Sequence, residues 1–197
     1  MRTTYAAVIL AGGSARRLGG RDKPAVTVAG VSLLDRVTAA CAHATQVVVV
    51  GPEQQGGPVA ALAAGLRMLG VAATGPHIPG NDRGPNPPAG PGVGAVALLA
   101  ADLPLLTTGA LDALAGALPD HDGALYVDGD GRRQLLCGLW RVEALRDRLA
   151  TADPDGMPLR KLVAGLRVAE LTDPAEPWFD CDTPEQLAEA ERRLRAS

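Results

Sequence analysis

Residues 10–24 read LAGGSARRLGGRDKP, and this stretch follows the apolar run Ala6–Leu10. The run predicts a buried parallel strand. A strand that continues into a glycine-rich loop presents backbone N–H groups to an anion, and glycine lets a phosphate approach them closely. The loop also carries four cations, Arg16, Arg17, Arg21 and Lys23, although the chain has a net charge of −3. It therefore predicts a phosphate-binding site; the alternative is an ordinary strand-to-helix turn with solvated arginines.

This loop differs from two familiar nucleotide-binding motifs. A Walker A loop needs Ser or Thr after its lysine, but Pro24 follows Lys23, and no G-x-G-x-x-G opens a helix here. The stretch instead resembles the L-A-G-G-x-x-x-R-x-G-x-x-K signature of nucleotidyltransferases that use a nucleoside triphosphate and release pyrophosphate. Its G-G-x-D-K ending and the short chain resemble most the MobA-like molybdenum cofactor guanylyltransferases. The residues that fill the pattern are Leu10, Ala11, Gly12, Gly13, Arg17, Gly19 or Gly20, and Lys23.

The resemblance implies an enzyme that moves GMP from GTP onto the phosphate of molybdopterin and releases pyrophosphate, with Mg²⁺ as cofactor. It implies that the nucleotide is bound by Leu10, Ala11, Gly12, Gly13, Arg17, Lys23 and Asp102. Arg17, Lys23 and Asp102 are the expected catalytic residues. A guanidinium fork matches phosphate oxygens and a lysine supplies a point charge, so Arg17 and Lys23 suit a triphosphate.

Two aspartates are candidate ligands of the metal, because Mg²⁺ prefers hard oxygen ligands. Asp102 ends the apolar run that begins at Val93, where a lone charge is costly unless it is paired or metal-bound. It also matches the x-x-x-D-x-P segment of the family; the alternative is a turn cap. Asp182, in the segment Trp178–Pro184, resembles the family's N-V-N-T-P-E-D segment near the metal. Its alternative is a helix cap, and Asp180 is a weaker candidate.

Strand-like and helix-like patterns alternate along the chain. This alternation predicts an α/β fold, a Rossmann-like three-layer α/β/α sandwich on a mostly parallel sheet, with ligands beyond the carboxyl ends of the strands. We expect a single domain over residues 1–197. The expected strands are 6–10, 46–50, 93–100, 124–127, 134–140 and 168–171, and 177–182 is extended. The expected helices follow Ser32 and Thr183 as caps, or span 58–69, 110–118, 142–150 and 158–166.

Two connections are unusual. Gly75–Gly92 holds eleven Gly or Pro in eighteen residues, which predicts a mobile or polyproline-like loop. Gly51–Gly57 is shorter than the family's connection, where side chains that read the base usually lie. Only Glu53 is left there as an acidic group that could accept from a guanine edge.

Composition excludes several classes of protein. Aromatic residues are 3% of the chain and the pI is about 5.6, which argues against a nucleic-acid partner. No apolar run approaches the ~18 residues that a membrane span needs, and we expect no signal peptide before the first strand. Three scattered cysteines lack zinc spacing and suit a reducing cytoplasm.

Alternative functions stay open from the sequence. A cytidylyltransferase, or another nucleotidyltransferase acting on molybdopterin or a sugar phosphate, would use the same motifs. A catalytically silent nucleotide-binding protein would also keep the loop. The expected partners are a nucleoside triphosphate, molybdopterin or another phosphorylated acceptor, and proteins that mature molybdoenzymes.

Overall fold

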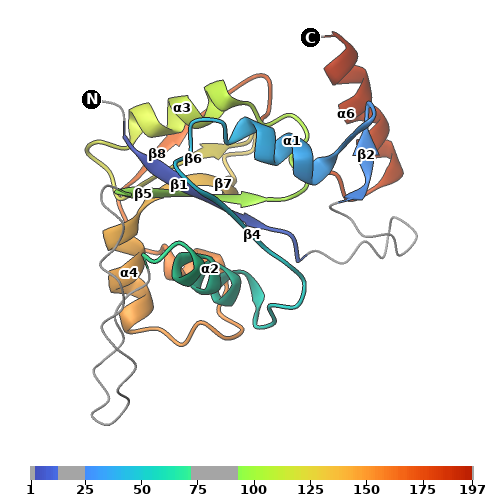
Figure 1. Ribbon diagram of the computed structural model, residues 1–197. Coiled ribbons are helices and arrows are strands. Elements are labelled where there is room, and N and C mark those ends of the chain that lie inside the picture. The colour runs from blue at the N-terminus through green and yellow to red at the C-terminus, as the bar shows by residue number, and fades with distance from the viewer. Residues whose placement is uncertain (1–2, 13–24, 72–92, 197) are drawn as a thin grey trace.

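The computed structural model describes residues 3–12, 25–71 and 93–196, and a six-stranded sheet forms its centre (Figure 1). The strand order is β4-β1-β5-β7-β6-β8. Strand β1 pairs in parallel with β4 and β5, and β8 pairs in parallel with β6. Only β7 is antiparallel to its neighbours within this sheet, so the mostly parallel sheet is confirmed. The strands are β1 (Tyr5–Leu10), β4 (Val47–Val50), β5 (Ala95–Ala100), β6 (Gly123–Val127), β7 (Arg133–Arg141) and β8 (Val168–Leu171).

Helices cover both faces of the sheet, as Figure 1 shows. Side chains of a strand alternate between its two faces. On β1, Tyr5, Ala7 and Ile9 pack into one hydrophobic cluster with α1 and α3, whereas Ala6 and Val8 pack into another with α2, α4 and α5. The predicted three-layer sandwich is therefore confirmed. The helices are α1 (Leu33–Ala40), α2 (Gly57–Met68), α3 (Thr108–Ala117), α4 (Val142–Ala150) and α5 (Leu159–Leu162).

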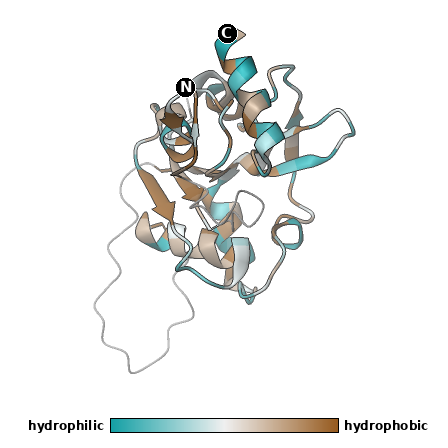
Figure 2. Cartoon of the chain, turned by 90° about the vertical axis from the view of Figure 1, so that its right-hand side faces the viewer, coloured by the Kyte–Doolittle hydropathy of each residue, from teal (hydrophilic) through white to brown (hydrophobic). Residues whose placement is uncertain are grey.

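A small third cluster lies beside the sandwich. The antiparallel strands β2 (Thr27–Val28) and β3 (Val31–Ser32) form a hairpin that α6 (Pro184–Ala196) contacts. The buried core of this cluster is Val28, Leu33, Cys181 and Ala190. Figure 2 shows hydrophobic strands inside the molecule and many hydrophilic residues on α6. The cluster matters for the site because it buries Cys181 between two aspartates.

Most expected elements are present, with ends that shift by up to two residues. The segment expected to be extended over 177–182 instead begins with a turn, in which Phe179 N–H donates to the Glu176 carbonyl (2.9 Å). The β2–β3 hairpin was not among the expected elements. The helix expected over 158–166 is only the short α5, which ends at Leu162 with Val163 as its C-cap, and Gly165 beyond it has a positive φ of 76° that a longer helix would not allow. The third strand begins at Ala95 rather than Val93. The loop expected over 75–92 lies outside the described residues. Within the described ranges, no helix has the length and apolarity needed to cross a membrane.

Candidate active site

A cavity of about 520 Å³ lies beyond the carboxyl ends of β1, β4 and β5. Its floor continues the sheet, because Ala11 N–H donates to the Val50 carbonyl (2.8 Å) and Ala101 N–H donates to the Leu10 carbonyl (3.1 Å). Leu10, Ala11, Gly12 and Asp102, all predicted to bind nucleotide, line this first cavity. The end of the sheet therefore holds the backbone of the predicted nucleotide-binding residues in a fixed arrangement.

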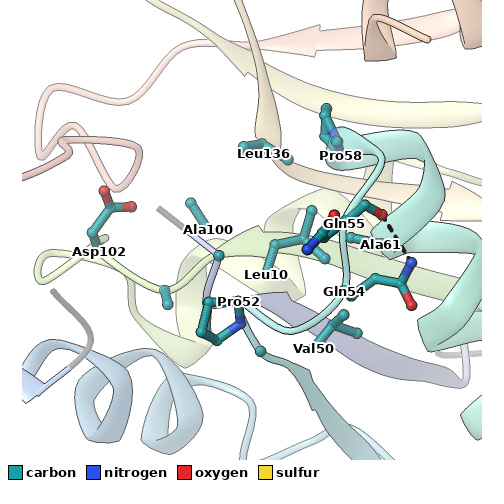
Figure 3. Close-up of a pocket in the computed structure, with 15 residues that line it drawn as sticks. Leu10, Val50, Pro52, Gln54, Gln55, Pro58, Ala61, Ala100, Asp102 and Leu136 are labelled. Atoms are coloured by element: carbon teal, nitrogen blue, oxygen red, sulfur yellow. Dashed lines mark hydrogen bonds between the residues drawn. The ribbon is translucent and has the colours of Figure 1, made fainter. Parts of the chain in front are cut away.

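The first cavity has two chemically different ends. Figure 3 shows Asp102 at one end and the side-chain amides of Gln54 and Gln55 at the other, with Leu10 and Ala100 between them. The Gln54 side chain is oriented by a hydrogen bond from Nε2 to the Gln55 carbonyl (2.9 Å). The Glu53 carboxylate lies against Gly51, where it would overlap with any Cβ. Amides, rather than the Glu53 carboxylate that was expected as a guanine acceptor, thus line this end of the cavity.

Three carboxylates converge beside this cavity. Oxygen atoms of Asp102, Asp180 and Asp182 all lie within 4.8 Å of one another. Asp102 is half-buried and follows β5, whereas Asp180 and Asp182 come from the segment before α6. Residues about eighty positions apart in the sequence are therefore joined in one acidic cluster.

Backbone contacts explain how the cluster is held together. Cys181 N–H donates to the Asp102 carbonyl (3.2 Å), and the Cys181 side chain is fully buried under α6. Because side chains alternate in extended backbone, burial of Cys181 turns both flanking aspartates away from that core. The Gln186 side chain accepts from the backbone N–H of Asp182 (2.8 Å) and of Thr183 (3.0 Å). Gln186 N–H in turn donates to Thr183 Oγ1 (3.3 Å), so the predicted cap by Thr183 is confirmed.

This donor set fits a magnesium ion. Carboxylate oxygens are the protein ligands that Mg²⁺ prefers, and it usually binds to few of them while phosphate and water complete its shell. Asp102 and Asp182, the predicted metal ligands, both belong to the cluster, and Asp180 joins them. The cluster also concentrates negative charge that a cation would neutralise.

A second cavity, of about 450 Å³, lies on the other side of Asp102. The two cavities share Pro58, Ala100, Asp102 and Leu136 as lining residues. The antiparallel direction of β7 creates this wall, because Cys137 pairs with Leu99 and the residues before it extend past the end of β5. A ligand in either cavity would therefore come close to Asp102.

The other walls of the second cavity combine polar and aromatic side chains. Arg133, Gln134 and Trp178 line it, together with Asp180 and Asp182. Arg133 Nε donates to the Glu170 carboxylate (2.6 Å), and Gln134 Nε2 donates to Asp128 Oδ2 (3.0 Å).

Cys137 also lines the second cavity, and its protonation state limits its chemistry. Burial raises the pKa of the Cys137 thiol to about 12, so it stays protonated at neutral pH. A thiol in this state is a poor nucleophile. The carboxylates and the Arg133 guanidinium are therefore the charged groups that the described residues offer to a ligand in this cavity.

The structure brings together only part of the predicted site. Gly13, Arg17 and Lys23 lie outside the described residues, so their roles stay predictions. Gln54, Gln55 and Trp178 line the cavities without having been predicted as binding residues. The one signal for Gln54 and Gln55 in the sequence was their place in the short connection after the second strand, where side chains that read the base were expected. For Trp178 the signal in the sequence was weaker: it lies two residues before Asp180, a candidate metal ligand.

Comparison with known proteins identifies the family. The family model described as "MobA-like NTP transferase domain" matches residues 7–173. The chain belongs to this family. A molybdenum cofactor guanylyltransferase of Rhodobacter capsulatus is 34% identical over 200 residues, which cover 96% of each chain. A second, from Nitrobacter hamburgensis, is 32% identical, with 94% of this chain and 92% of that protein covered.

Solved structures support the fold of this MobA-like NTP transferase. Molybdopterin-guanine dinucleotide biosynthesis protein A from Archaeoglobus fulgidus covers 98% of the chain and is itself covered completely, with a TM-score of 0.64 and 18% identity. A 2-C-methyl-D-erythritol 4-phosphate cytidylyltransferase from Thermus thermophilus covers 98% and is also covered completely, with a TM-score of 0.65 and 19% identity. The predicted resemblance, the Rossmann-like fold and the assignment to nucleotidyltransferases are therefore confirmed.

Proposed function

We propose that this enzyme transfers GMP from GTP to the terminal phosphate of molybdopterin and releases pyrophosphate. The observation that supports this most directly is the pair of cavities that share Asp102. Transfer between two substrates requires that they meet at one reacting centre in a fixed orientation. The names of the curated relatives, molybdenum cofactor guanylyltransferases, support the choice of both substrates.

In this proposal GTP occupies the first cavity. Its guanine lies toward Gln54 and Gln55, and backbone groups of residues 10–12 contact the nucleotide. Its phosphates lie toward Asp102, where Arg17 and Lys23 of the glycine-rich loop neutralise them. This orientation agrees with the position of amides at one end of the cavity and a carboxylate at the other.

The acceptor occupies the second cavity, with its phosphate directed toward Asp102. An oxygen of that phosphate forms a bond to the α-phosphorus of GTP while the bond from this phosphorus to the bridging oxygen breaks and pyrophosphate leaves. A phosphate monoester is already largely ionised near pH 7, because its second pKa is about 6, so no side chain needs to act as general base. Asp102 and Asp182, with Asp180 beside them, would hold Mg²⁺. When bound, the ion neutralises phosphate charge as it develops in the transition state.

Measuring pyrophosphate release tests this function. Each of GTP, CTP, ATP and UTP is supplied with and without molybdopterin at fixed Mg²⁺. We expect GTP to yield pyrophosphate only when molybdopterin is also present. The kcat/KM for GTP should exceed that for ATP by ~10²-fold and no more, because the short connection after β4 provides few buried polar groups to reject a wrong base. A preference for CTP would favour the cytidylyltransferase alternative. Nucleotide binding with no release for any pair would favour a silent nucleotide-binding protein.

Two further parts of the proposal concern the setting of the enzyme. All three cysteines are free and buried, which fits a reducing compartment, and we propose a cytoplasmic location on that ground. Proteins that mature molybdoenzymes are proposed as recipients of the product.

A further inference from the structure

Trp178 has an unusual position among the aromatic residues of this chain. The sequence contains five of them: two Trp, two Tyr and one Phe. Tyr5, Tyr126 and Trp140 are at most 2% exposed, and Phe179 lies under the Arg193 guanidinium, 4.8 Å from its ring centroid. Among the described lining residues of the second cavity, Trp178 is the one aromatic side chain. In a chain with so few rings, this ring lies where the proposed acceptor would bind.

Packing behind Trp178 holds its indole in place. The ring lies against Tyr126, with centroids 5.3 Å apart and planes tilted by 33°. Tyr126 is itself fixed, because its buried hydroxyl donates to the Ala110 carbonyl (3.0 Å). The backbone is held as well, since Phe179 N–H donates to the Glu176 carbonyl (2.9 Å). The indole is therefore a preorganised surface, and binding to it costs little ordering.

The rest of the second cavity suits a ligand with a flat ring at one end and a phosphate at the other. Trp178 supplies an apolar wall, and the carboxylate cluster with its proposed cation lies beside it. Aromatic faces favour offset stacking against flat heteroaromatic rings, and this contact adds to simple apolar burial. A sugar phosphate has no such ring.

We propose that Trp178 stacks on the flat pyrimidine ring of the acceptor's pterin and thereby selects a phosphorylated pterin over a sugar phosphate. This inference rests on the proposed function and adds the residue that distinguishes between acceptors. Stacking on the indole also sets the distance from the acceptor's phosphate to Asp102, because ring and phosphate belong to one molecule. Trp178 is thus a binding residue for the acceptor, and the nucleotide does not touch it.

Kinetics of three variants test this proposal. Trp178→Leu removes the ring, Trp178→Phe keeps an aromatic face, and Phe179→Leu is the matched control, since it removes the neighbouring ring that packs in the cluster under α6. We expect Trp178→Leu to raise the KM for molybdopterin by roughly 10- to 100-fold, the range of ring–base stacking losses. The KM for GTP should change less than about twofold. Trp178→Phe should recover most of the loss, and Phe179→Leu should leave both KM values unchanged.

A second measurement uses the unmodified enzyme. Trp140 is fully buried, so quenching of tryptophan fluorescence by acrylamide reports mainly on Trp178. Saturating molybdopterin should protect Trp178 from acrylamide, whereas glucose 1-phosphate or GTP alone should not. This measurement needs no variant and no turnover.

The outcomes separate this proposal from the proposed function. Protection by molybdopterin without any pyrophosphate release would refute the function and leave the stacking assignment intact. Turnover with an unchanged KM for molybdopterin in Trp178→Leu would overturn the assignment. If Trp178→Leu fails to fold, turnover in the unmodified enzyme without acrylamide protection would overturn it equally. Equal rises in the KM values for GTP and molybdopterin would show that Trp178 only supports the fold.

Discussion

Asp102 connects the two cavities of the site, because it lines both of them and its carbonyl accepts a hydrogen bond from Cys181 N–H. We expect Asp102→Asn to lower kcat by about 10²–10³-fold, the usual cost of removing one electrostatic contact to a transition state. The amide keeps the shape but loses the charge that would hold Mg²⁺ in the proposed reaction. Steady-state kinetics at several Mg²⁺ concentrations measure this loss, and calorimetry should still detect GTP binding.

A matched control for Asp102 is Asp112, which lies on α3 and pairs with His43 (3.0 Å) away from both cavities. Asp112→Asn should leave kcat within about twofold of the unmodified enzyme, because Asp112 lines neither cavity. The fold should also be kept, because surface ion pairs contribute little to stability. Full activity in Asp102→Asn would contradict the assignment of Asp102 to the metal.

Lys23 lies outside the described residues, so its role depends on the sequence alone. The chain has one other lysine, Lys161 on α5, which serves as a control. Lys23→Ala should reduce kcat/KM for GTP by ~10²-fold or more, since the lysine would neutralise phosphate charge. The melting temperature should stay within about 2 °C, and Lys161→Ala should be nearly silent in both measurements. A drop in melting temperature with unchanged turnover would instead indicate a structural role for Lys23.

At the scale of elements, Gly65 allows α2 to pack closely against β1. Gly65 is buried on α2, and a Cβ there would overlap with the Val8 side chain. This contact holds α2 against the strand that leads into the first cavity. Leu62 and Leu66 flank the same contact and are fully buried. The position of α2, whose first residues Gly57 and Pro58 line the cavity, therefore depends on Gly65.

We expect Gly65→Ala to destabilise the protein by about 1–3 kcal/mol, the usual cost of overpacking a core. The melting temperature should fall by roughly 3–10 °C. Gly116→Ala on α3 is the matched control, because Gly116 is exposed and a Cβ there would meet nothing within 4 Å. Alanine is the better helix former, so this control should gain about 0.5–1 kcal/mol. Thermal unfolding of both variants measures the difference, and equal effects would argue against a tight contact between α2 and β1.

Much of this arrangement of elements could be predicted from the sequence, because it depends on local patterns. Apolar runs of strand length marked β1, β4 and β5, and Ser32 and Thr183 act as helix caps through the expected hydrogen bonds. The β2–β3 hairpin was missed because its strands have two residues each, too few for an alternating pattern. Its turn is Ala29-Gly30, both at positive φ, and only Gly30 is typical of such a turn.

The site was predictable in its residue types and less so in its arrangement. Asp102 could be recognised in the sequence, because it is a carboxylate that follows a buried strand. The contact between Cys181 N–H and the Asp102 carbonyl could not, since it joins distant segments through backbone groups that carry no residue-specific signal. The direction of β7, which sets the wall between the cavities, depends likewise on tertiary pairing. The sequence therefore indicated which residues belong to the site, but it did not indicate which of them contact one another.

At the scale of the whole molecule, we predict one domain in which residues 75–92 contribute little to stability. Their content of Gly and Pro leaves few side chains to bury and few N–H groups for a ladder. Replacing them with a short Gly-Ser linker should change the melting temperature by less than about 3 °C and preserve a single unfolding transition. Calorimetry measures both quantities. A large drop, or a second transition, would show that the segment packs against the core.

The wall shared by the two cavities has a consequence for the end of the reaction. In the proposed reaction each substrate occupies one cavity, the dinucleotide product spans both, and pyrophosphate is the fragment that departs. A ligand held at two linked sites benefits from a high effective concentration at the second site once the first is bound. The product should therefore dissociate more slowly than either substrate, and its release should limit turnover. A rapid burst of pyrophosphate equal to the enzyme concentration, followed by a slower steady rate, would reveal an enzyme that retains its product until a recipient removes it.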